Sequence, residues 1–111
     1  MGKRVLIVTD RIGRANDELG GVLMKNFLYA LARNEDPPAA VMLMNEGVRL
    51  ACTGSASLDD LVLLVENGVK VSSCGTCLDF LGLKDALEVG GVGIMADAVA
   101  ALVADDVLTI A

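Results

Sequence analysis

The sequence predicts an α/β fold in three layers, α/β/α, in which helices cover both faces of a mainly parallel sheet of about five strands. Short apolar runs alternate with longer amphipathic segments, which is the pattern of repeated strand–helix–strand units. The composition is 54% hydrophobic but only 3% aromatic, so the apolar side chains are aliphatic, as in strands buried on both faces. Since the chain has 111 residues and no linker-like segment, we expect a single domain over residues 1–111.

The first half of the chain is predicted to form two strands and one long helix. Arg4 to Thr9 is a continuous apolar run of the buried-strand type, and a polar loop from Asp10 to Asn16 follows it. Apolar residues at helical spacing predict an amphipathic helix from Asp17 to Ala32. Ala40 to Met44 is the second strand, and a short helical turn should follow from Asn45 to Leu50. The apolar stripe expected on the long helix consists of Leu19, Val22, Leu23, Phe27, Ala30 and Leu31.

A second helix and a third strand are expected next. Ser57 is placed to cap a helix that runs to about Glu66, because a serine side chain can accept a hydrogen bond from the first turn. Asn67 and Gly68 should end this helix. Val69 to Ser73 is then the third strand.

The last part of the chain should complete the sheet. Leu87 to Val89 is a candidate for a short fourth strand, followed by a turn at Gly90 and Gly91. Met95 to Ala104 is an apolar helix, and Asp106 to Ile110 is the last strand. Because parallel strands are joined by right-handed crossovers, helices are expected on both faces of the sheet.

Two cysteines mark the point where the third strand passes into a short helix. Cys74, Gly75, Thr76 and Cys77 follow the strand directly. Backbone N–H groups from Gly75 to Leu78 and the positive end of the helix dipole would stabilise a thiolate at this point. We therefore identify Cys74 and Cys77 as the candidate reactive residues, with Gly75 allowing the backbone to turn closely around the sulfur.

Polar residues follow each of the first two strands as well. The carboxyl ends of parallel strands meet at one edge of the sheet, so these loops should converge with the cysteines. We expect Asp10, Arg11 and Asn45 to flank the cysteine crevice together with Gly75 and Thr76. Asn45 can instead cap the turn that it begins. The loop from Asp10 to Asn16 can bind an anion or simply lead into a capped helix, and its three acidic neighbours favour the second interpretation.

Charge, hydropathy and residue usage exclude several classes of function. The net charge is −6, with 9 basic and 15 acidic residues and no basic patch, so neither nucleic acid nor an anionic membrane is an expected partner. The longest apolar runs have strand length, far below the roughly 20 residues of a membrane span. The chain enters a strand at once without a signal-peptide pattern, so we expect a cytoplasmic protein with reduced thiols. A mean hydropathy of +0.59 indicates an apolar surface buried between copies of the chain.

Histidine is absent, which removes Ser-His-Asp and Cys-His catalysis and the commonest zinc sites. Two thiolates alone would fill half of a zinc shell, so no metal site and no cofactor are predicted, although cysteine pairs from several subunits could complete a site. The third cysteine, Cys52, ends an apolar helical turn and is interpreted as part of the core.

The chain resembles the DsrE/DsrF-like family, and within it the carboxyl-terminal domains of YedF-like proteins, which are sulfurtransferase-like and linked to selenium metabolism. The residues that carry the resemblance are Asn45-Glu46-Gly47-Val48, Gly54-Ser55, Gly68-Val69, Cys74-Gly75-Thr76-Cys77-Leu78, the opening loop and helix from Gly13 to Phe27, and the final helix and strand. The resemblance implies an α/β/α fold, a trimer or hexamer, and a cysteine that carries sulfur as a persulfide. That role maps onto Cys74, eight residues before Gly82, whereas Cys77 has no counterpart in the single-cysteine relatives. A TusA-like domain is an implied partner.

The resulting hypothesis is a sulfurtransferase-like domain that carries sulfur or selenium as a persulfide on Cys74 between donor and acceptor proteins. Cys77 could attack this persulfide, releasing hydrosulfide and leaving a disulfide. Two alternatives remain open at this point: a thiol–disulfide redox protein, suggested by the CxxC spacing, and a non-catalytic oligomeric binding module. Both thiols could also be buried packing residues.

Overall fold

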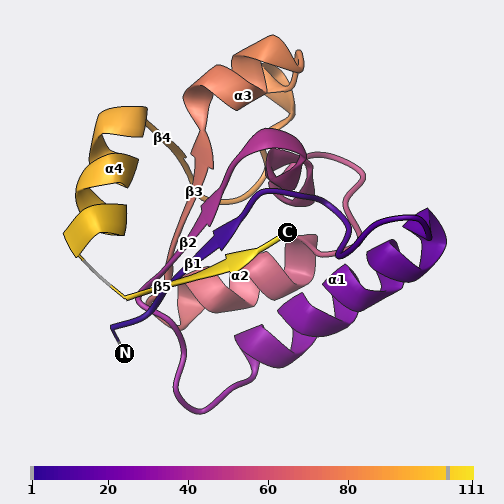
Figure 1. Ribbon diagram of the computed structural model, residues 1–111, viewed down its shortest axis with the longest axis horizontal. Coiled ribbons are helices and arrows are strands. Elements are labelled where there is room, and N and C mark those ends of the chain that lie inside the picture. Colours follow the sequence, from indigo (N-terminus) through magenta and orange to yellow (C-terminus); the bar gives the residue numbers. More distant parts are fainter. Residues whose placement is uncertain (1, 105) are drawn as a thin grey trace.

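A computed structural model describes residues 2–104 and 106–111, and its sheet confirms the predicted fold class (Figure 1). The described residues form one five-stranded sheet in the order β4-β3-β2-β1-β5. All four strand pairings are parallel. The strands are β1 (Arg4–Ile7), β2 (Ala40–Leu43), β3 (Lys70–Cys74), β4 (Gly91–Gly93) and β5 (Val107–Ile110).

The helices lie on both faces of the sheet. The chain adds β1 to β4 in one direction, so right-handed crossovers place the intervening helices on one face; the return to β5 carries the last helix across the other face. Figure 1 shows α1 and α2 together on one side and α4 on the opposite side. The helical segments are α1 (Asp17–Ala32), η1 (Asn45–Ala51), α2 (Leu58–Glu66), α3 (Gly75–Phe80), η2 (Lys84–Ala86) and α4 (Met95–Ala104), of which η1 and η2 are 3₁₀ helices.

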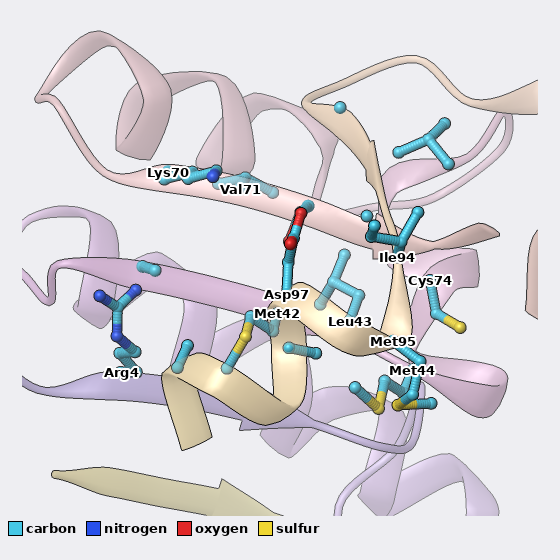
Figure 2. A pocket seen from close by; sticks show the side chains of 17 residues that line it. Arg4, Met42, Leu43, Met44, Lys70, Val71, Cys74, Ile94, Met95 and Asp97 are labelled. Carbon is cyan, nitrogen blue, oxygen red and sulfur yellow. The ribbon is translucent and has the colours of Figure 1, made fainter. Parts of the chain in front are cut away.

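The face under α4 is thinly covered. All ten residues of α4 are described and none is buried, although the helix is almost entirely apolar. Val103 is 80% exposed, and Met95 and Val99 are about half exposed. A cavity of about 270 Å³ remains between α4 and the sheet (Figure 2). None of the described helices is both long enough and apolar enough to cross a membrane.

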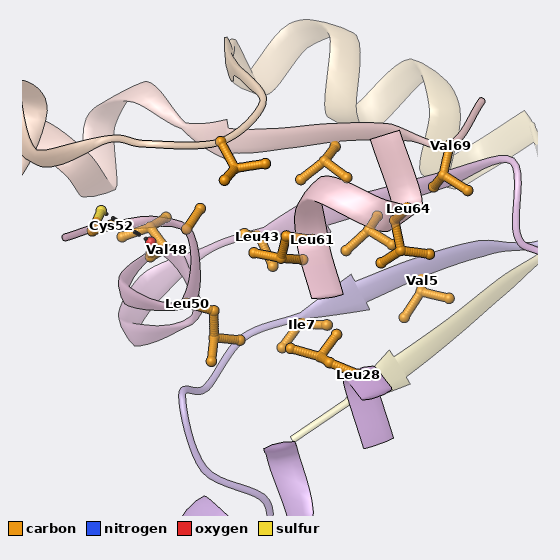
Figure 3. Packing of buried hydrophobic residues seen from close by; sticks show 14 of the residues in the cluster. Val5, Ile7, Leu28, Leu43, Val48, Leu50, Cys52, Leu61, Leu64 and Val69 are labelled. Atoms are coloured by element: carbon orange, nitrogen blue, oxygen red, sulfur yellow. Dashed lines mark hydrogen bonds between the residues drawn. The ribbon is translucent and has the colours of Figure 1, made fainter. Parts of the chain in front are cut away.

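The opposite face holds the hydrophobic core (Figure 3). Val5, Ile7, Val41 and Leu43 point from the two central strands toward α1 and α2, and all four are at most 1% exposed. Gly20, Met24, Leu28 and Ala32 of α1 are buried on this face. Leu61 and Leu64 are the core residues of α2.

The bounds predicted for α1 are confirmed, but the predicted apolar stripe is only partly right. Phe27 and Leu31 are partly buried against the core, whereas the other four members of the stripe are exposed. Leu19, Val22 and Leu23 are 52%, 52% and 42% exposed. The helix faces the sheet with the series that begins at Gly20, because a side chain there would lie 2.9 Å from the Ile12 carbonyl oxygen. This close contact with the preceding loop fixes the rotation of the helix.

Two smaller predictions are wrong. The fourth strand is Gly91–Gly93, whereas Leu87 forms only an isolated antiparallel bridge with Cys52. The chain turns at Gly90, whose φ is +79° and whose added Cβ would lie 2.5 Å from the Val71 carbonyl oxygen, so pairing with β3 begins after it. Ser57 does precede α2, but within the described residues its side chain makes no capping hydrogen bond.

A buried carboxylate joins α1 to α2. Asp60 is 1% exposed and accepts hydrogen bonds from Lys25 Nζ at 2.6 Å and from Arg33 Nη1 at 3.0 Å. Burial alone would raise the pKa of Asp60, but the hydrogen bonds and charges of the two cations outweigh it and hold the pKa below its ordinary value. The Arg33 guanidinium also stacks on the Tyr29 ring, 3.6 Å from its centroid.

Candidate functional site

Cys74 belongs to the buried hydrophobic cluster and also lines the cavity under α4, so it lies at the border between the two. It is the last residue of β3, in which Val71 and Ser73 are buried and Ser72 is half buried beside the cavity. Cys74 is 8% exposed and lines the cavity of about 270 Å³. Its sulfur is therefore sheltered from bulk solvent but has open space beside it (Figure 2).

Cys77 lies in the first turn of α3, next to Cys74. Its Sγ accepts a hydrogen bond from the backbone N–H of Asn45 at 3.1 Å. Burial raises the pKa of the Cys77 thiol, the Asn45 N–H partly opposes this, and the adjacent Cys74 thiol raises the pKa further. The loops after β2 and β3 thus meet at Cys77.

The backbone of Asn45 explains how this N–H reaches the sulfur. Its φ is +52°, a left-handed conformation that asparagine adopts more readily than most residues. The side-chain Oδ1 accepts a hydrogen bond from the Glu46 N–H at 2.8 Å. The main chain of Asn45 therefore contacts a candidate reactive residue, as the first alternative expected. Its side chain binds only the next N–H, and the N-cap of η1 is Met44, which makes no side-chain capping bond.

The expected gathering of helix amides on Cys74 is not found. Cys74 is the N-cap residue of α3, yet in the described part of the chain its side chain accepts no capping hydrogen bond. The amide that does donate to a cysteine sulfur comes from η1, and it donates to Cys77.

Gly75 and Thr76 occupy the first turn of α3 between the cysteines. An added Cβ at Gly75 would lie 3.0 Å from Val92 Cγ1, so this glycine is needed for the close approach of β4. Thr76 is exposed. These two residues thus position the two cysteines and the neighbouring edge strand.

The structure does not bring Asp10 and Arg11 to the cysteines. Arg11 pairs with Asp10 at 3.2 Å and with Asp17 at 3.1 Å. Asp10 lines a second cavity of about 360 Å³, beside Lys25, Arg49 and Cys52. No hydrogen bond or ion pair among residues 2–104 and 106–111 joins Asp10 or Arg11 to Cys74 or Cys77.

The loop after β1 leads into α1 on the helical face, which explains this separation. The Ile12 N–H donates to the Gly20 carbonyl at 3.0 Å, which ties the loop to the helix. Asn16 Oδ1 caps α1 by accepting from the Leu19 N–H at 2.9 Å. The interpretation of this loop as the start of a capped helix is confirmed. Cys52, as expected, is core: it is 2% exposed and its Sγ–H donates to the Val48 carbonyl.

Sequence reasoning missed the other residues around Cys74. The cavity is also lined by Met44, which follows β2, and by Met95 and Asp97 of α4. The place of Met44 could have been expected, because Leu43 pairs with Ser73 and the residues that follow this pair are Met44 and Cys74. Among the described residues, no group of three or more Cys, Asp or Glu side chains is placed to hold a metal ion.

No protein-family model matches the chain, and no curated protein sequence matches it either. Solved structures do. The crystal structure of the ychN protein from E. coli superposes with a TM-score of 0.72 at 21% identity, covering 99% of this chain and 100% of that one. The chain has the DsrE-like fold of YchN. Two proteins of unknown function share it.

The two proteins of unknown function come from Methanobacterium thermoautotrophicum and Bacteroides thetaiotaomicron. MTH1491 from Methanobacterium thermoautotrophicum gives a TM-score of 0.68 at 20% identity, covering 98% of this chain and 99% of that chain. BT1422 from Bacteroides thetaiotaomicron gives 0.64 at 13% identity, covering 98% of this chain and 95% of that chain. At these identities the likeness concerns the fold, and the chemistry has to be argued from the residues of this chain.

Proposed function

We propose that the chain is a sulfurtransferase-like domain that carries a sulfane sulfur, or selenium, as a persulfide on Cys74. The observation that carries this proposal is the position of Cys74 at the end of β3, with its sulfur beside a cavity of about 270 Å³ and the Cys77 thiol next to it. A persulfide is one sulfur atom longer than a thiol, and the cavity offers space for it away from bulk water. The DsrE-like fold is compatible with such a role.

The proposed transfer needs no cofactor. The Cys74 thiolate attacks the outer sulfur of a donor persulfide, a new S–S bond forms, and the donor leaves as a thiolate. A thiolate of the acceptor then attacks the outer sulfur and regenerates Cys74. When no acceptor is present, the Cys77 thiolate attacks Cys74 Sγ; hydrosulfide leaves, the sulfane sulfur is reduced, and the two thiols are oxidised to a disulfide.

The proposal also covers the oligomeric state of the chain, its compartment and its partner proteins. The apolar, unburied surface of α4 supports assembly into a homo-oligomer, for which we propose a trimer or hexamer. A reducing compartment such as the cytoplasm would keep both thiols available. The donor and acceptor are proteins with accessible thiols, and a TusA-like domain is one proposed partner.

The test is direct mass analysis after incubation with a cysteine desulfurase and cysteine. The reduced protein should gain about 32 Da per sulfur on Cys74. Cys74→Ser should abolish the gain, Cys77→Ser should prolong the life of the adduct, and Cys52→Ser is the matched control because that thiol is buried elsewhere. An absent adduct, or one that survives Cys74→Ser, would refute the proposal. Repeating the assay with selenocysteine in place of cysteine, so that the desulfurase carries selenium as a selenopersulfide, distinguishes the two cargoes.

A thiol–disulfide redox function is the second candidate, favoured by the contact between the Cys74 and Cys77 thiols. It predicts a reversible disulfide with a potential of about −120 to −270 mV, the range of dithiol oxidoreductases. Equilibration in a glutathione series, followed by alkylation and mass analysis, measures this potential. A pair that stays reduced throughout the series excludes the redox function but not the persulfide carrier.

A further inference from the structure

Sulfur-containing side chains gather around the cavity that Cys74 faces. Three of the five methionines of the chain, Met42, Met44 and Met95, line this cavity together with Cys74. Figure 2 shows Met44, Met95 and Cys74 at the same end of the cavity, where β2, β3 and β4 finish. Met42 lies nearer the other end, toward Arg4.

The strand register places Met44 beside Cys74. Leu43 pairs with Ser73, and this pair is followed by Met44 directly after β2 and by Cys74 at the end of β3. Neighbouring strands are about 4.8 Å apart, and residues at matching positions point to the same face. Both Met44 and Cys74 line the cavity, which is consistent with this shared face. The thioether of Met44 and the thiol of Cys74 therefore belong to the same end of one cavity.

Met95 approaches Cys74 from the other neighbouring strand. Cys74 pairs with Gly93 of β4, a residue that has no side chain to fill the space beside the sulfur. Met95 follows two residues later as the first residue of α4, lines the same cavity and is 51% exposed. Cys77 adds a second thiol in contact with that of Cys74. The two thiols and two thioethers thus come from the end of β2, the end of β3, the first turn of α3 and the start of α4.

We propose that these four sulfur atoms form a binding site for monovalent copper, Cu(I). Thiolate and thioether ligands are soft and select Cu(I), whereas Mg²⁺ and Ca²⁺ need oxygen ligands and structural zinc sites need four ligands drawn from Cys, His, Asp and Glu. The described residues offer no group of three Cys, Asp or Glu for such ions. Binding of one Cu(I) would release the protons of Cys74 and Cys77 and leave the metal in the same oxidation state.

This site is independent of sulfur transfer but uses the same cysteine. Copper and a sulfane sulfur would compete for Cys74, so the copper-loaded protein should fail to accept sulfur. Met44 is half buried and Met95 half exposed, so the metal could be delivered from the cavity mouth by an exchange of sulfur ligands.

The experiment is an anaerobic titration of the full reduced chain with Cu(I) in competition with the coloured chelator bathocuproine disulfonate. We expect the chain to withdraw about one Cu(I) from the chelator, with an affinity that rises with pH because thiol protons are released. Cys74→Ser and Cys77→Ser should each lower the affinity at least about tenfold, since even outer partners of metal ligands contribute that much. The double variant Met44→Leu/Met95→Leu should weaken binding while leaving both thiols in place.

Matched controls keep the volume of the side chain and the fold. Met42→Leu changes a methionine at the far end of the same cavity, and Cys52→Ser changes a core thiol; neither should alter the affinity. Complete retention of copper by the chelator, binding that survives Cys74→Ser, one copper per two chains, or an unchanged affinity in the methionine double variant would each overturn the proposed four-sulfur site. A chain that fails this titration but gains sulfur in the desulfurase assay would retain the persulfide function without the copper site.

Discussion

Replacing Asp60 by asparagine should destabilise the fold, because Asp60 joins α1 to α2 through two cationic partners. The carboxylate is 1% exposed and accepts hydrogen bonds from Lys25 and Arg33. Asparagine keeps the shape and one acceptor oxygen but removes the charge. The side chains of Lys25 and Arg33 are 40% and 42% exposed, so both cations can return to water and are not left buried.

The expected loss is therefore smaller than for a fully buried ion pair. Hydrogen bonds to charged groups contribute about 1.5 to 3 kcal/mol each, and one neutral bond remains, so we expect Asp60→Asn to lower the free energy of unfolding by about 2 kcal/mol. For a domain of this size, that is a fall in Tm of about 8 °C. Asp59→Asn is the matched control, because Asp59 is the exposed neighbour on the same helix and should change stability by less than about 0.5 kcal/mol.

The pH dependence tests the cause. The pKa of Asp60 is lowered in the folded state, so its stabilising contribution is present above the unfolded pKa of about 3.9 and is lost as the pH falls through the folded value. Urea unfolding monitored by circular dichroism should show a constant difference between the two proteins near neutral pH and a shrinking one below about pH 4. An Asp60→Asn protein as stable as the parent at pH 7 would refute the reasoning, because desolvation of the carboxylate would then outweigh its two bonds.

Three further predictions concern the segments that shape the site. Gly47→Ala should cost about 3 kcal/mol or more in chemical unfolding, because the new Cβ would lie 2.4 Å from the Ile7 carbonyl oxygen and displace η1. Ser73→Ala should leave the protein as stable or up to about 1 kcal/mol more stable, since the hydroxyl is buried without a partner among the described residues. Alkylation of Cys77 by iodoacetamide should require a higher pH than that of an ordinary thiol, and Cys74→Ser should lower the midpoint because the contributions of Cys74 that raise the pKa disappear.

Each of these three predictions has a result that would contradict it. Gly21→Ala is the control for Gly47, because its added Cβ meets nothing within 4 Å and should be tolerated. An equally mild Gly47→Ala would contradict the close packing of η1 on β1. A clear loss of stability in Ser73→Ala would mean that the hydroxyl has a partner in solution. A Cys77 midpoint unaffected by Cys74→Ser would contradict the contact between the two thiols.

The elements of the fold could be predicted because each is encoded locally. The aliphatic runs give β1, β2 and β3, and the helical spacing gives the bounds of α1 and α4. The rotation of α1 could not be predicted, because apolar residues surround the helix and both Leu23 and Met24 fit an apolar stripe. Contact of Gly20 with the preceding loop decides between them. Similarly, β4 contains two glycines in three residues, so its pairing with β3 leaves almost no mark in the sequence.

The position of the candidate site along the strands was predictable, but the face of the sheet on which each residue lies was not. The carboxyl-end rule brings Asn45 to Cys77, as expected. This rule does not predict on which face of the sheet each loop lies. Because β3 has consecutive serines, one on each face, its sequence pattern does not indicate the face of Cys74 either. Asp10 and Arg11 lie at the same edge of the sheet but over the helical face, where the chain leads into α1. The sequence of this strand end therefore does not predict which residues surround Cys74.

The two faces of the sheet are covered unequally, and this difference connects the proposed chemistry of Cys74 to the proposed oligomer. Cys74 and α4 line the same cavity, and none of the described residues of α4 is buried. A helix this apolar gains little from covering the sheet unless another surface covers the helix in turn. Docking of a second chain against Val99 and Val103 would hold α4 in place and fix the size of the cavity. The reactivity of Cys74, with sulfur or with copper, would then depend on assembly even though every proposed ligand comes from one chain.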